Sequence, residues 1–125
     1  MAYVINLPTF KDERGSLTVV EKLLPFEIKR FYYIYNISQK RGGHRHKKTI
    51  QALICLNGKC EVYINNGMRE ETILLDMPSK CLILEPKDWH TMDNFTNESV
   101  LLVFASEFYD KNDYIEREYN LDDRV

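Results

Sequence analysis

Apolar residues along this chain gather in short runs that are rich in β-branched and aromatic residues and are separated by Gly, Pro, Asn and Asp. No segment before residue 106 keeps the 3.6-residue period of an amphipathic helix, so the pattern predicts a mostly β protein. The spacing of the runs is typical of a sandwich or barrel. The predicted strands cover residues 3–7, 16–21, 30–37, 43–47, 50–56, 59–64, 71–75, 81–84 and 99–105.

The sequence also predicts the local structure of two segments outside these runs. Asn65, Asn66 and Gly67 separate two strands and predict a hairpin turn, because Asn and Gly tolerate positive φ. After Ser106 the chain becomes polar and acidic, which indicates a short C-terminal helix or a tail that lies over the barrel. We expect that segment to be peripheral to any chemistry.

The length of 125 residues fits a single domain, which we assign to residues 1–125. A hydrophobic content of 44% and a charged content of 29% are ordinary for a soluble globular protein. No apolar stretch approaches the ~20 residues that cross a bilayer, and the first residues do not resemble an export signal. We therefore expect a cytoplasmic protein with no membrane partner.

The cysteines and the charge narrow the class further. Cys55, Cys60 and Cys81 are odd in number, lack metal-knuckle spacing and lie among aliphatic residues, which predicts buried reduced thiols. A net charge of −2 gives no general attraction to nucleic acid, so no nucleic-acid partner is expected.

Candidate chemistry centres on residues 41–51. His44 and His46 are two apart in a strand-like context, so both imidazoles face the same way. The third histidine, His90, lies in a second aromatic-flanked segment. An isolated His-x-His pair is usually just exposed, but the glycines at 42 and 43, the neighbouring basic residues and a matching distant histidine favour a site.

The spacing Gly42-x-His44-x-His46-x4-Gln51-x6-Gly58 matches most of the first cupin motif, and residues 86–94 resemble the second, offset by one residue at the proline. The resemblance implies an all-β fold with a single cupin, or jelly-roll, β-barrel. Metal-binding cupins carry Glu at the position of Gln51, and a neutral amide is a poor metal ligand. We therefore expect no metal and imidazoles that are free for acid–base work, with a three-histidine metal site as the alternative.

Other residues near these motifs have two interpretations each. Tyr33 and Tyr35 share a strand face, and either belong to a core or line a cavity. Arg41 and Lys47 either form a solvated rim or bind phosphate at a cavity mouth. Trp89 either packs or stacks on a sugar or base.

Over nearly its whole length the chain resembles the sugar 3,4-ketoisomerases, small cupins that act on dTDP-4-keto-6-deoxy-D-glucose. The segments that carry the resemblance are 12–17, 26–30, 32–36 and 41–47, the last followed by Gln51. The resemblance implies a metal-independent isomerase without a cofactor, whose partner is a dTDP-linked 4-keto-6-deoxy sugar. It also implies a homodimer with exchanged N-terminal strands and a place in the synthesis of 3-amino-3,6-dideoxy sugars for surface glycans.

On this hypothesis His44 and His46 are the catalytic acid–base pair, since imidazole titrates near ~6.5. Which of them is the base at carbon 3 stays open. We expect the 3-keto-6-deoxygalactose isomer as product, on the premise that His90 lies across the cavity from the pair. The candidate substrate-binding residues are Arg14, Tyr33, Tyr35, Arg41, Lys47, Gln51, Trp89 and His90.

Two alternatives remain from other classes. A metal-dependent cupin enzyme, such as a dioxygenase or isomerase, would contain a stoichiometric metal ion after purification. A non-catalytic nucleotide-sugar-binding cupin would bind the sugar without exchanging its carbon 3 proton.

Overall fold

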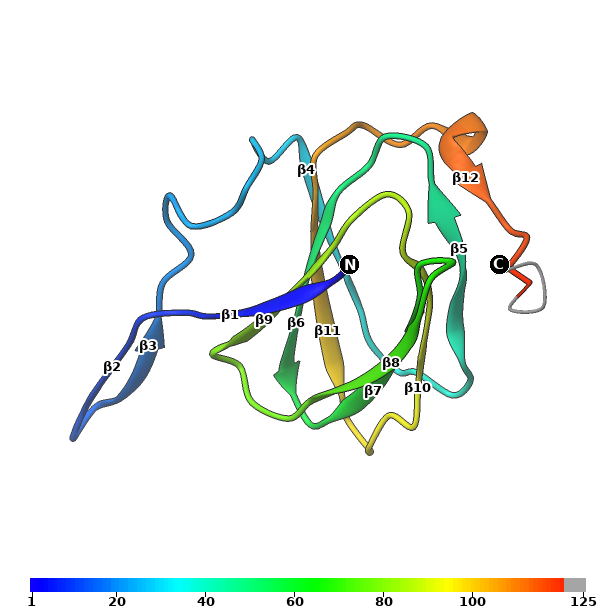
Figure 1. Cartoon of the computed structure of the whole chain (residues 1–125). Helices are drawn as coiled ribbons and strands as arrows, with labels where there is room; N and C mark the ends of the chain where they lie inside the picture. Colours follow the sequence, from blue (N-terminus) through cyan, green and yellow to red (C-terminus); the bar gives the residue numbers. More distant parts are fainter. Residues whose placement is uncertain (121–125) are drawn as a thin grey trace.

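The computed structural model describes residues 1–120, and in them the chain is almost entirely β-structure (Figure 1). A single 3₁₀ turn, η1, spans Lys111–Asp113, and no α-helix is present in these residues. The strands are β1 (Tyr3–Asn6), β2 (Thr9–Asp12), β3 (Gly15–Thr18), β4 (Arg30–Ile34), β5 (Arg41–His46), β6 (Gln51–Asn57), β7 (Cys60–Asn65), β8 (Glu70–Leu75), β9 (Lys80–Leu84), β10 (Trp89–Asp93), β11 (Val100–Ala105) and β12 (Tyr114–Ile115).

The strands form two five-stranded sheets that face each other and a separate two-stranded hairpin (Figure 1). The first sheet has the order β1-β9-β6-β11-β4, and the second has the order β12-β5-β10-β7-β8. All pairings are antiparallel, and most join strands that are distant in sequence. This arrangement confirms the all-β, jelly-roll class that the sequence predicts.

Most predicted strands are present with shifted ends, and three strands were not predicted. The segment 16–21 forms strand only as β3, and the segment 30–37 ends as strand at Ile34. The strands β2, β10 and β12 have no counterpart in the prediction because they are short or mix polar residues into both faces. The expected C-terminal helix is replaced, within the described residues, by η1 and β12.

The core lies between the two sheets, and a second apolar layer covers the outside of the first sheet. Alternation along β6 places Leu53 and Cys55 in the core between the sheets and Ala52 and Ile54 in the outer layer. The outer layer is covered by Val20, Leu24 and Phe26 from the segment before β4. All three cysteines are buried and free of disulfides, which confirms the prediction for them.

The predicted turn at Asn65–Gly67 is confirmed and joins β7 to β8. The Asn66 side-chain oxygen accepts hydrogen bonds from the backbone N–H groups of Met68 and Arg69, and Gly67 has a φ of +90°. These bonds hold the four-residue connection in one shape.

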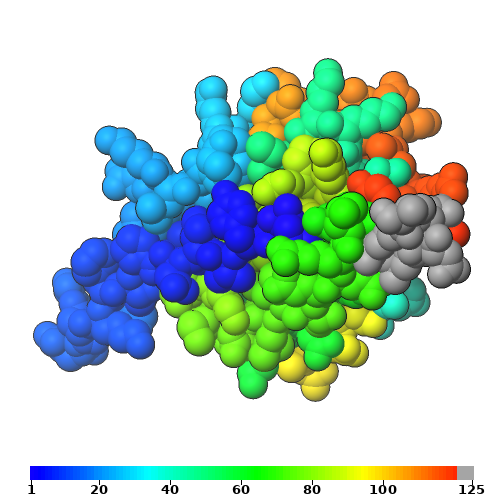
Figure 2. Space-filling model, viewed as in Figure 1, coloured from blue at the N-terminus to red at the C-terminus, as the bar shows by residue number. Residues whose placement is uncertain are grey.

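The β2–β3 hairpin extends away from the barrel as an arm (Figures 1 and 2). Its apolar side chains Phe10 and Leu17 are 65% and 60% exposed. No helix in residues 1–120 is both long and apolar enough to span a membrane.

The glycines at the start of β5 determine how closely this strand approaches β10. Residues His44 and His90 face each other, but the register shifts beyond them so that Gly42 pairs with Thr91. Gly42 has a φ of +88°, and a Cβ atom there would lie 2.8 Å from the His90 carbonyl oxygen. Gly43 has a φ of +83° with nothing within 4 Å of its Cβ position. A bulge of this kind re-aims the following side chains.

We predict that Gly42→Ala lowers the free energy of unfolding more than Gly43→Ala does. Both substitutions place a side chain in the left-handed region, at a cost of about 1–2 kcal/mol. Only Gly42→Ala adds the contact with the His90 carbonyl, which forces β5 and β10 apart. Urea unfolding of the two variants measures the difference, and equal losses would contradict the steric role of Gly42.

Candidate active site

A cavity of about 980 Å³ lies between the sheets at one end of the barrel. Strand β4 contributes Arg30, Tyr32 and Ile34, and β5 contributes residues 41–44. Strand β10 contributes His90 and Met92, and the C-terminal segment contributes Tyr109, Lys111, Tyr114 and Glu116.

The three histidines of the chain meet beside this cavity. The ring centroids of His44 and His46 are 5.1 Å apart, and those of His44 and His90 are also 5.1 Å apart. The centroids of His46 and His90 are 6.2 Å apart. The pair on β5 and the distant histidine on β10 converge, as expected from their spacing, because β5 and β10 are neighbours in the second sheet.

Hydrogen bonding determines the tautomer of His90. Its Nδ1 lies 2.9 Å from the Asp88 carbonyl oxygen, which can only accept, so Nδ1 carries the proton. The Nε2 atoms of His90 and His46 are buried and have no hydrogen-bond partner among the described residues. In its neutral form His90 therefore presents an unshared lone pair.

Burial keeps these imidazoles neutral. It lowers the pKa of His90 to about 3, with smaller contributions from His44 and His46. It lowers the pKa of His46 to about 4, with His44 again acting in the same direction. The pKa of His44 is lowered by burial as well, partly offset by the Gly42 backbone and the Glu116 carboxylate. The site thus holds proton acceptors and not imidazolium ions.

Asp113 fastens the C-terminal segment next to these histidines. Its carboxylate accepts hydrogen bonds from the Thr49 hydroxyl and from the backbone N–H groups of Lys48 and Thr49. Burial alone would raise its pKa, but these hydrogen bonds and His46 outweigh burial and lower it. The carboxylate therefore stays ionised and anchored near His46.

Tyr32 faces the histidines from the first sheet. Gln51 donates a hydrogen bond of 3.1 Å from its side-chain amide to the Tyr32 hydroxyl. Burial raises the pKa of Tyr32, so the phenol keeps its proton. Gln51 is itself buried behind Tyr32 and acts on the cavity through it, whereas the sequence interpretation placed Gln51 at the substrate.

The charge of the cavity lining is positive. Three cationic side chains, Arg30, Arg41 and Lys111, line it together with one carboxylate, Glu116. Such a lining attracts an anion with two charges, such as a diphosphate. Arg41 is thus where the sequence interpretation expects it, at the wall of the cavity.

Four of the predicted binding residues lie outside the cavity lining. Tyr33 on β4 and Tyr35 just after it are each 59% exposed and border a separate surface pocket, because alternation turns Tyr32 and Ile34 inward instead. Trp89 points to the side of β10 opposite His90, and its indole N–H donates to the Glu116 carbonyl. Lys47 is exposed and outside the lining.

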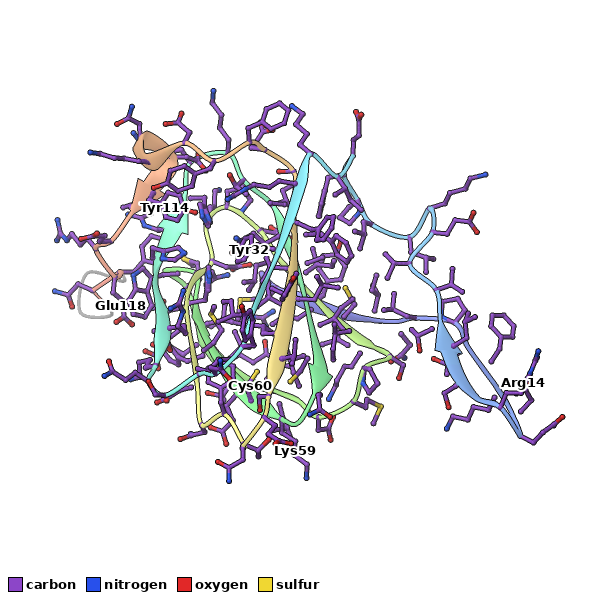
Figure 3. All side chains as sticks on the ribbon, turned by 180° about the vertical axis from the view of Figure 1, so that it is seen from behind. Arg14, Tyr32, Lys59, Cys60, Tyr114 and Glu118 are labelled. Atoms are coloured by element: carbon purple, nitrogen blue, oxygen red, sulfur yellow. The ribbon has the colours of Figure 1, made fainter. Side chains whose placement is uncertain are left out.

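Arg14 lies outside the cavity as well. It sits at the tip of the β2–β3 arm, with 86% of its side chain exposed, and forms an ion pair with Asp12 (Figure 3). His90 is not across the cavity from the His44 and His46 pair but beside it on the adjacent strand, so the premise for a galacto product is wrong.

The sequence interpretation missed several lining residues, and it wrongly treated the C-terminal segment as peripheral. Arg30 precedes the aromatic run of residues 31–33 and Tyr32 lies inside it, and the pattern does not show which face of this run turns inward. Tyr109, Lys111, Tyr114 and Glu116 reach the cavity because β12 pairs with β5. The alternation of aromatic and charged residues in 107–119 was the available signal.

No group of three or more His, Cys, Asp or Glu side chains within residues 1–120 is placed to hold a metal ion together. The amide of Gln51 is already engaged with Tyr32. Metal independence stays a prediction.

A family model described as FdtA: WxcM-like, C-terminal, matches residues 2–122. The chain belongs to this FdtA family. A TDP-4-oxo-6-deoxy-alpha-D-glucose-3,4-oxoisomerase from Aneurinibacillus thermoaerophilus is 45% identical over 121 residues, which are 94% of this chain and 86% of that protein. This match agrees with the resemblance that the sequence motifs indicate.

Solved structures of similar proteins match this chain over nearly its whole length. QdtA, a sugar 3,4-ketoisomerase from Thermoanaerobacterium thermosaccharolyticum in complex with TDP, is 42% identical, with a TM-score of 0.89 over 93% of this chain and 88% of that one. A 3,4-ketoisomerase from Helicobacter canadensis is 41% identical, with a TM-score of 0.89 over 93% and 90% of the two chains.

The buried histidines predict how stability depends on pH. Their pKa values are about 4 and about 3 in the folded state for His46 and His90, against ~6.5 when unfolded. Between those values only the unfolded chain gains protons, so the free energy of unfolding falls as the pH falls below ~6.5. The slope reaches at most about 1.4 kcal/mol per pH unit for each histidine.

Urea unfolding between pH 7 and 5 measures this slope, and NMR titration of the imidazoles assigns it. The Asp113 carboxylate does not interfere, because its lowered pKa confines its effect to pH values below its ordinary 3.8. Titration midpoints near 6.5 for His46 and His90 would contradict the buried neutral site.

Proposed function

We propose that this protein is a sugar 3,4-ketoisomerase that converts dTDP-4-keto-6-deoxy-D-glucose to a dTDP-3-keto-6-deoxyhexose. One observation carries the proposal: three neutral histidines, two of which have an Nε2 atom without a hydrogen-bond partner among the described residues, lie beside a cavity whose lining is cationic. The named activities of the 45% identical relative and of the structural neighbours support it.

The reaction needs a base and an acid at adjacent carbons. The base removes the proton on carbon 3, which the carbon 4 carbonyl acidifies, and an enediolate forms. A proton then reaches carbon 4, and the ketone is left at carbon 3. His44 lines the cavity and His46 lies next to it, so this pair supplies the proton transfers.

Substrate charge supports the basicity of the pair. Burial gives His46 a pKa of about 4, which is low for a general base at neutral pH. A diphosphate with two negative charges in the cavity stabilises an imidazolium and raises that value. Binding therefore prepares the base.

The enediolate oxygens need hydrogen-bond donors where negative charge develops. Tyr32 takes the role that the sequence interpretation gave to Tyr33 and Tyr35, because it is the tyrosine of β4 that lines the cavity. Gln51 orients it by occupying one lone pair of its hydroxyl. Arg41 is the proposed ligand of the diphosphate.

We also propose a cytoplasmic homodimer with exchanged N-terminal strands. The exposed Phe10 and Leu17 on the β2–β3 arm support this assembly, since apolar side chains on an extended arm gain from burial in a second copy. Such an exchange would carry Arg14 onto the partner subunit. The proposed role is the supply of 3-keto sugars for 3-amino-3,6-dideoxy sugars of surface glycans.

We expect His44→Asn and His46→Asn each to lower kcat by about 10²–10⁴-fold, since Asn cannot accept a proton at neutral pH. The assay is incubation with dTDP-4-keto-6-deoxyglucose in deuterated water, followed by NMR of the sugar. Circular dichroism and TDP binding check the fold. Near wild-type turnover in both variants would reject the pair as the proton-transfer site.

The same assay separates the alternatives. A binding protein without activity exchanges no carbon 3 proton, and a metal-dependent cupin loses activity to EDTA and regains it with one divalent ion. The coupling constants of the product distinguish the galacto from the gluco isomer, for which the position of His90 gives no preference.

Arg41→Ala should weaken TDP binding by roughly ten- to a hundredfold, because a charge-assisted hydrogen bond contributes about 1.5–3 kcal/mol. Arg69→Ala is the matched control, since Arg69 is exposed in the β7–β8 turn away from the cavity. Calorimetry with TDP measures both. Equal affinities in the two variants would place Arg41 in the solvated rim.

A further inference from the structure

The C-terminal segment places a second phenol between the two catalytic histidines. The ring centroid of Tyr114 lies 4.8 Å from that of His44 and 4.6 Å from that of His46, both in edge-on contact. Pairing of β12 with β5 sets Tyr114 directly opposite His46. Figure 3 shows Tyr114 and Tyr32 at the same end of the barrel, with Lys59 at the opposite end.

The hydroxyl of Tyr114 has a proton to give. Arg30 donates to it from Nη2 at 3.4 Å, which uses a lone pair and leaves the phenol O–H. Within residues 1–120 no protein acceptor is hydrogen-bonded to that O–H. The neighbouring cation favours donation, because it stabilises negative charge on the phenol oxygen.

Arg30 also links this phenol to the first one. Its guanidinium carbon lies 5.3 Å from the centroid of the Tyr32 ring. The Tyr32 hydroxyl accepts from Gln51 and is likewise without a protein acceptor in the described chain. Two phenols, each already accepting one hydrogen bond, therefore face the cavity from opposite sheets.

We propose that Tyr114 is a catalytic residue that donates a hydrogen bond to one of the two enediolate oxygens. This inference rests on the proposed isomerase function. Isomerisation moves one proton from carbon 3 to carbon 4 and one from the carbon 3 oxygen to the carbon 4 oxygen, with no net gain or loss. Negative charge appears on these two oxygens, which matches two donors, Tyr32 and Tyr114. No covalent bond to Tyr114 forms.

The test is Tyr114→Phe, which keeps the ring against His44 and His46 and removes only the hydroxyl. Tyr3→Phe is the matched control, because Tyr3 lies on β1 outside the cavity lining. We expect Tyr114→Phe to lower kcat on the order of 10²-fold, with KM and TDP affinity within about twofold of wild type. Exchange of the carbon 3 proton in deuterated water should slow to the same extent.

NMR titration of His46 distinguishes a catalytic role of the Tyr114 hydroxyl from a positional one. For a catalytic role, the pKa of His46 must be the same in Tyr114→Phe and in wild type. A loss of activity together with a shifted His46 titration would overturn the proposal, as would a kcat within about threefold of wild type. A variant that does not fold would overturn it too, since the hydroxyl would then serve the fold. If the wild type itself does not turn over, the proposed isomerase function fails instead.

Discussion

The absence of a side chain at Gly42 is the constraint on which the rest of the site depends. Strands β5 and β10 can lie close together only because no Cβ meets the His90 carbonyl. That approach places His44 opposite His90 and lets the bulge aim His44 into the cavity. The positions of the neutral imidazoles and of the phenols around them all depend on this pairing of β5 with β10.

The second requirement is low polarity around the histidines combined with positive charge on the wall of the cavity. Burial removes water from the imidazoles and keeps them unprotonated. The cations Arg30, Arg41 and Lys111 lie on the cavity wall, where they can meet an anion. The neutral histidines and the cationic side chains can therefore share one cavity. Protonation of a histidine becomes favourable when a bound anion, and not a protein carboxylate, supplies the negative charge.

The sequence predicted the fold class, most strands and the meeting of the histidines, because these depend on period-2 patterns and on motif spacing. It did not predict which face of β4 turns inward, since aromatic residues occupy both faces of that strand. Tyr32 was therefore passed over in favour of Tyr33 and Tyr35. The contribution of Tyr114 was missed because it depends on a two-residue strand that pairs with β5 at the edge of the second sheet, a tertiary contact that the alternation in residues 107–119 does not specify.

The docking of β12 also has a consequence for solubility. Strand β5 would otherwise be the edge of its sheet, with unpaired backbone groups beside a glycine bulge. Exposed edges of this kind invite pairing with strands of other molecules and lead to aggregation. The pairing of Tyr114 and Ile115 with β5 covers Arg45 and His46 and shields this edge. The strand that brings Tyr114 to the cavity therefore also keeps copies of the chain from associating through β5.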